Sequence, residues 1–167
     1  MYIFLALICG AINLGLLGHS HTRYLHRHSV HPNIHTTLLP GHSFILPTFY
    51  TSPTDITHYI NIPHAHPHLD AILISWGDNE IDQPGHTISN GIANAIIDSL
   101  TELLLFFTQN NIPTFILPPL PCPIPTFAQT HDYNTARHFI RPRLQNTIAN
   151  LHFNYEPLIT LPDLTFN

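Results

Sequence analysis

The sequence predicts an α/β fold: a three-layer α/β/α sandwich around a parallel sheet of about five strands. Short apolar runs alternate with longer segments of helical periodicity along the whole chain. One run, Asp70–Trp76 (DAILISW), is apolar almost throughout, as expected of a central parallel strand covered on both faces. A hydrophobic content of 44 % in 167 residues supports one packed core, so residues 1–167 are interpreted as a single domain.

Four apolar runs are predicted to be strands because each is short and is followed at once by glycine or proline. They are Ile12–Leu17 before Gly18, Ile34–Leu39 before Pro40-Gly41, Asp70–Trp76 before Gly77, and Thr114–Leu117 before Pro118-Pro119. Leu151–Leu161 can supply a fifth strand. The expected strand order is 2-1-3-4-5, the flavodoxin-like order.

Three segments between these strands are predicted to be helices. Ser20–His28 is a polar-faced helix that opens with a serine cap. A long helix follows Pro84-Gly85, ends at Asn110-Asn111 and buries one apolar face made of Ile88, Ile92, Ile96, Leu100, Leu103, Leu104 and Phe107. About Asp132–Asn150 forms the last helix, in which Pro142 should cause a kink or a split. Its inward face is expected to hold Phe139, Ile140, Leu144 and Ile148, whereas Pro63–His68 reads as a loop.

The charge balance argues against a nucleic-acid partner. Five arginines and no lysine stand against ten acidic residues, which gives a formal net charge of -5 with the histidines neutral. A protein that binds a phosphate backbone needs a basic stripe. The fifteen histidines supply polar surface that charged residues, at 9 % of the chain, do not.

The apolar N-terminal segment Tyr2–Leu17 is too short to cross a bilayer, so no membrane partner is expected. No lysine or arginine precedes it, as a signal peptide would require, and late cleavage would remove the strand at Ile12–Leu17. An intracellular location is favoured, and secretion stays open. Cys9 and Cys122 form no disulfide framework and are read as buried free thiols.

Two histidine clusters, His64-x-His66-x-His68 and His19-x-His21, could each place imidazoles on one side of an extended segment. Fifteen histidines produce such spacings by chance, and no cysteine or acidic residue lies among them. We therefore expect surface histidines, with no metal and no cofactor. A histidine-rich metal-binding protein is the weaker alternative.

In a parallel α/β sheet the ligand site lies at the carboxyl ends of the strands. Here these ends are followed by Gly18-His19-Ser20, by Gly41, by Gly77-Asp78-Asn79-Glu80 and, near the C-terminus, by Asp163-Leu164-Thr165-Phe166. Each has a simpler interpretation: Ser20 as a helix cap, Gly41 as part of a Pro-Gly turn, and Asn79 as a turn residue.

The order of these segments resembles the SGNH (GDSL-type) hydrolase family. That family carries Gly-Asp-Ser after its first strand, a glycine after the second, Gly-x-Asn-Asp after the third and Asp-x-x-His near its end. The resemblance implies that Ser20 is the nucleophile in acyl transfer from a small-molecule ester. It implies an oxyanion hole formed by the Ser20 and Gly41 N–H groups and the Asn79 amide, and an orienting role for Asp163.

Three residues depart from the family pattern: His19 replaces an aspartate, Glu80 replaces the second acid, and Phe166 stands where the catalytic histidine is expected. The helix that follows that histidine in the family is also missing from this sequence. The GHS variant and the low charge are similar to SGNH-like domains carried by some retroelements. Weak hydrolysis is therefore expected, and the alternative is a catalytically inactive SGNH-like binding module.

Overall fold

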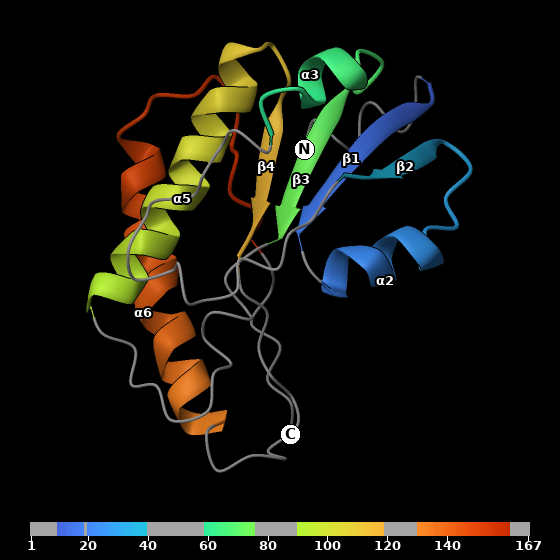
Figure 1. The fold of residues 1–167 in the computed structure, drawn as a ribbon. Coiled ribbons are helices and arrows are strands. Elements are labelled where there is room, and N and C mark those ends of the chain that lie inside the picture. The colour runs from blue at the N-terminus through green and yellow to red at the C-terminus, as the bar shows by residue number, and fades with distance from the viewer. Residues whose placement is uncertain (1–9, 19, 40–58, 76–89, 119–129, 161–167) are drawn as a thin grey trace.

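The computed structural model describes residues 10–18, 20–39, 59–75, 90–118 and 130–160 (Figure 1). Their strands form one open sheet in which every pairing is parallel and the order is β2-β1-β3-β4. The strands are β1 (Ile12–Gly18), β2 (Ile34–Leu38), β3 (Ala71–Ser75) and β4 (Thr114–Leu117). The predicted α/β class and parallel sheet are confirmed, and these four strands follow the predicted order.

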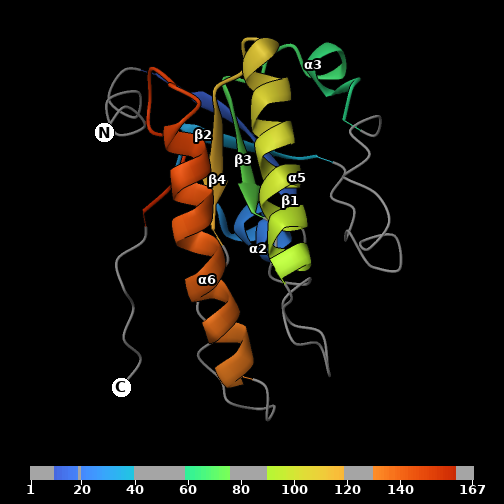
Figure 2. The ribbon, with the colours of Figure 1, turned by 90° about the vertical axis from the view of Figure 1, so that its left-hand side faces the viewer.

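Helices lie on both faces of the sheet, which makes the three layers expected from the sequence. The long helices α5 (Asn90–Gln109) and α6 (Thr130–Ala149) cover one face, and α2 (Ser20–His28) lies on the other (Figures 1 and 2). α5 ends as predicted, because Asn111 adopts the left-handed conformation (φ 61°) that commonly stops a helix. Among the described helices, none combines the length and apolar content that a membrane crossing requires.

The hydrophobic core lies between the sheet and the pair α5–α6. Side chains alternate along a parallel strand, so Ile72 and Ile74 of β3 point into this core together with Ile116 of β4. The helices contribute the apolar stripes that periodicity predicted: Ile96, Leu100, Leu103, Leu104 and Phe107 from α5, and Ile140, Leu144 and Ile148 from α6. Within the predicted α5 stripe, Ile88 and the side chain of Ile92 lie outside the described part of the chain.

The fifth strand predicted at Leu151–Leu161 is wrong for its described part, residues 151–160. These residues form a single β-bridge instead of a strand. Leu158 forms an isolated parallel bridge with Ile116. The Ile116 N–H donates to the Pro157 carbonyl (2.7 Å), and the Ile159 N–H donates to the Ile116 carbonyl (2.9 Å). One step earlier on β4, the Tyr155 hydroxyl accepts from the Thr114 N–H (3.0 Å) and donates to the Thr114 carbonyl (3.1 Å). A side chain therefore occupies the edge groups that a fifth strand would have paired.

Of the kink or split expected at Pro142 in α6 the split is wrong, and so is the inward position expected of Phe139. Pro142 does not split the helix, which runs through it as one element. Pro142 and His138 are both exposed, so the carbonyl that loses its hydrogen bond lies on the solvent side, where water can serve it. Phe139, expected to face inward, is 36 % exposed and lies under the Arg143 guanidinium, 3.9 Å from the ring centroid.

The segment expected to be a loop at Pro63–His68 contains a short helix, α3 (Ile62–Ala65). Its proline lies in the first turn, where the missing N–H is not needed for an intrahelical hydrogen bond. Ile62 anchors it because its side chain is buried in the core. Proline and histidine in this segment indicated a loop. The buried side chain of Ile62, which precedes them, stabilises a helical turn instead.

Candidate functional site

The sheet changes direction of winding between β1 and β3. From β1 the chain crosses through α2 to β2 on one side, whereas β3 lies on the other side of β1. In an open parallel sheet such a switch point leaves a crevice at the carboxyl ends of the two strands, where ligands bind. α2 begins there, at Ser20, two positions after β1 ends at Gly18. The predicted bounds of the helix Ser20–His28 are confirmed, but Ser20 is its first helical residue, so the cap position falls on residue 19, outside the described residues.

Gly18 allows the start of α2 to approach β3 closely. Its φ of 154° is a conformation that residues with a side chain rarely adopt. A Cβ at this position would collide with the Ser75 carbonyl oxygen and would lie 2.8 Å from the Thr22 Cγ2 atom. Glycine is therefore required here, and it brings the first turn of α2 against the last residue of β3.

The face of the sheet on which Ser75 lies follows from the strand register. The Thr36 hydroxyl is 3.1 Å from the His26 Nδ1 atom and 3.0 Å from the Ser29 hydroxyl, so Thr36 points toward α2. Thr36 pairs with Leu14, and Leu14 pairs with Ala71. Ser75 is four positions after Ala71 on the same strand, so its side chain also lies on the α2 face.

Ser75 is the unusual polar group of this region. Ser75 is 0 % exposed, and its hydroxyl has no hydrogen-bond partner among the residues that the structure describes. Leaving a buried hydroxyl unpaired costs about 1–3 kcal/mol. Sequence reasoning missed it because a serine inside DAILISW reads as part of an apolar strand. The sequence feature that could have indicated Ser75 as a site residue is its position near the carboxyl end of a predicted strand, where ligands bind in this class of sheet.

The start of α2 carries partial positive charge. The first N–H groups of an α-helix have no intrahelical partner, and the helix dipole places partial positive charge there. Residues 10–39 contain no acidic side chain, and Arg23 lies near the start of α2, whereas Arg27 lies in its last turn. Asp78 and Glu80 follow β3 in the sequence, outside the described residues. The arrangement can therefore accept an oxygen atom that carries or develops negative charge.

Of the residues predicted from the sequence, the structure places one. Ser20 is the first residue of α2 at the carboxyl end of β1. Gly41, Asn79 and Asp163 lie outside the described residues, as does Phe166. Whether these positions converge with Ser20 remains a prediction from the motif order.

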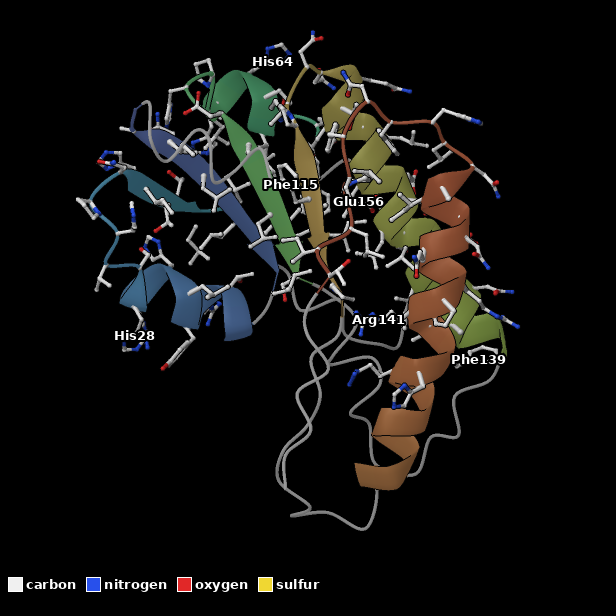
Figure 3. All side chains as sticks on the ribbon, turned by 180° about the vertical axis from the view of Figure 1, so that it is seen from behind. His28, His64, Phe115, Phe139, Arg141 and Glu156 are labelled. Carbon is white, nitrogen blue, oxygen red and sulfur yellow. The ribbon has the colours of Figure 1, made fainter. Side chains whose placement is uncertain are left out.

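The His64, His66 and His68 cluster lies elsewhere in the molecule. These histidines come from α3 and the turn after it, and Figure 3 shows His64 at the amino end of β3, opposite the end where α2 begins. The rings of His66 and His68 are 6.0 Å apart in an edge-on arrangement. Within the described ranges, no three histidine, cysteine or acidic residues are grouped so that they could hold a metal ion.

No family model matches this chain, and no curated protein matches it. The functional interpretation therefore depends on the motif order in the sequence and on the geometry around Ser20.

Proposed function

We propose that this chain is an SGNH-type serine hydrolase domain that acts on a small-molecule ester through Ser20. The observation that supports it best is the position of Ser20, which opens α2 directly after β1, beside the switch point between β1 and β3. A nucleophile in this position has next to it the first N–H groups of a helix, which have no hydrogen-bond acceptor within the helix. The motif order of Ser20, Gly41, Asn79 and Asp163 is the second support.

The proposed reaction is an acyl transfer. The Ser20 oxygen attacks the ester carbonyl carbon, the carbonyl electron pair moves onto its oxygen, and a base removes the serine proton. The N–H groups of Ser20 and Gly41 and the Asn79 amide are proposed to stabilise the oxyanion. Collapse of this adduct expels the alcohol, and water then releases the acid from the acyl-serine.

The proposed catalyst lacks the general base that the family uses. Phe166 stands where the family carries histidine, so Asp163 has no imidazole to orient in the family's manner. A positioned base contributes about 10²–10⁴-fold to such reactions, and an oxyanion hole alone leaves a residual rate. We therefore propose slow hydrolysis. Phe166 also favours the second candidate function, an inactive SGNH-like module that binds an ester without hydrolysing it.

Labelling with a fluorophosphonate probe, followed by mapping of the labelled peptide, tests the nucleophile. We expect slow labelling at Ser20, which Ser20→Ala abolishes. Ser29→Ala is the matched control, because Ser29 directly follows the other end of α2; labelling should persist in it. If the unmodified chain is not labelled at Ser20, the hydrolase proposal fails and the binding module is favoured.

Hydrolysis of p-nitrophenyl acetate tests the missing base. We expect turnover close to background in the unmodified chain and a rise of up to about 10²–10⁴-fold in Phe166→His. A fast rate in the unmodified chain that depends on Ser20 would contradict the proposed defect and would show that another residue acts as the base.

A further inference from the structure

We infer that the Ser75 hydroxyl belongs to the same site and serves as a hydrogen-bond donor to the anionic oxygen of the bound ligand. This inference rests on the proposed function, because it assigns a further group to the oxyanion that Ser20 would create. The resemblance to SGNH hydrolases assigns no role to this position, and the inference comes from the structure of β3.

The first argument is energetic. Ser75 is fully buried, and among the described residues nothing pairs with its hydroxyl. A residue of the same size without this cost, alanine or cysteine, would fill the end of an apolar strand at least as well. A buried polar group without a partner calls for an explanation, and a partner that arrives with the ligand supplies one.

The second argument is position. Ser75 pairs with Gly18 across the sheet, and its side chain lies on the α2 face, as the register from Thr36 shows. Gly18 brings the Ser75 backbone and the first turn of α2, at Thr22, into close proximity. Ser75, whose hydroxyl has no partner among the described residues, and the start of α2 are therefore neighbours, although they follow from two different strand ends.

The third argument is chemical. Helix N–H groups are donors only, and the hydroxyl proton of Ser75 can turn toward the same oxygen. When Ser20 attacks, the electron pair that leaves the carbonyl bond resides on that oxygen, and Ser75 donates a hydrogen bond without giving up its proton. In a site closed to water, such a donor contributes far more than it would in solvent.

The experiment uses the full chain and three variants. Ser75→Ala and Ser75→Cys both remove a good donor, and cysteine keeps nearly the original volume, so that a packing defect in one is checked by the other. Ser99→Ala is the control, because Ser99 is also a buried serine but lies on α5, on the opposite face of the sheet. Thermal unfolding, fluorophosphonate labelling rate and the thermal shift caused by inorganic phosphate are measured for each.

We expect both Ser75 variants to unfold at the same temperature as the unmodified chain or higher, since the hydroxyl makes no hydrogen bond to the residues that the structure describes. We expect the labelling rate at Ser20 to fall about tenfold or more, as for loss of an oxyanion donor. The stabilisation by phosphate should disappear in both variants, whereas Ser99→Ala keeps both properties.

The outcomes separate this inference from the proposed function. Unchanged labelling and an unchanged phosphate shift in both Ser75 variants would overturn the inference and leave Ser20 as the nucleophile. Absence of labelling in the unmodified chain would overturn the hydrolase proposal, and the phosphate measurement then decides on Ser75 alone. If the unmodified chain is neither labelled nor stabilised by phosphate, the inference about Ser75 is overturned too. A loss of stability in both Ser75 variants would show a structural hydroxyl and would also overturn it.

Discussion

The two faces of the sheet are built differently. On one face, α5 and α6 bury almost continuous apolar stripes, and Leu100, Leu103, Leu104 and Phe107 of α5 are all 0 % exposed. On the other face, α2 is thinly packed: of its described side chains Thr22 alone is buried, and every residue from Arg23 to His28 is exposed. The difference arises from sequence, because α5 is rich in leucine and isoleucine whereas α2 carries arginine and histidine.

This comparison shows how stability and the candidate site are divided within the molecule. Burial of apolar area is the main source of folding free energy, and it is concentrated on the α5–α6 face. The described contacts between α2 and the sheet include the hydrogen bond of His26 with Thr36, which also bonds to Ser29 just after the helix, and the close approach at Gly18. The candidate site therefore lies on the less densely packed side, where local opening is expected to be easiest.

The largest loss of stability is expected on β3, where the adjacent side chains of Leu73 and Ile74 point to opposite faces of the sheet. Ile74→Asp places a carboxylate in the core, which costs an amount comparable with a typical total stability of about 5–15 kcal/mol, so the chain should not fold. Leu73→Asp is the matched control on the α2 face, where Leu73 is only half-buried, and it should cost clearly less. Circular dichroism of both variants checks this; equal loss of structure would contradict the division between the faces.

An intermediate effect is expected from truncating one aromatic side chain on each side. Phe107→Ala should lower the free energy of unfolding by about 3–5 kcal/mol, because Phe107 is fully buried against its neighbours. Tyr24→Ala should cost about 0.5 kcal/mol or less, since Tyr24 on α2 is 64 % exposed. Urea unfolding measures both. A large loss for Tyr24→Ala would show that α2 carries more of the stability than its burial indicates.

The smallest effect concerns the edge of β4. Tyr155→Phe removes the hydroxyl that pairs with the N–H and the carbonyl of Thr114, and it should cost about 1–2 kcal/mol. Hydrogen exchange at the Thr114 amide should become faster, and that of the core amides should follow only the global loss. Tyr24→Phe on α2 is the control and should change neither; a protected Thr114 amide in Tyr155→Phe would mean that the hydroxyl does not close this edge.

Local signals predicted much of this fold. The helix Ser20–His28, the strand Thr114–Leu117 and the buried stripe from Ile96 to Phe107 were predicted from capping, turn residues and periodicity. These features depend on neighbours a few positions apart, which a sequence displays directly. The motif order also allowed Ser20 to be chosen as a site residue, although its role is still a prediction.

Other features were decided by residues far apart in the chain. Tyr155 pairs with Thr114 across 41 positions and takes the place of the fifth strand. Phe139 lies outside the core because Ile140, Leu144 and Ile148 on the neighbouring stripe already fill the space against α5. The Ser75 hydroxyl, which has no partner among the described residues, lies beside the start of α2 because β1 pairs with β3 and Gly18 lies against Ser75. The amino-acid sequence by itself determined the two-turn and longer helices, the four strands of the sheet and most of their apolar faces, because those follow from local periodicity. Tertiary packing alone decided α3, the sheet edge and the surroundings of the candidate site, because hydrogen bonding and burial there depend on which distant groups meet.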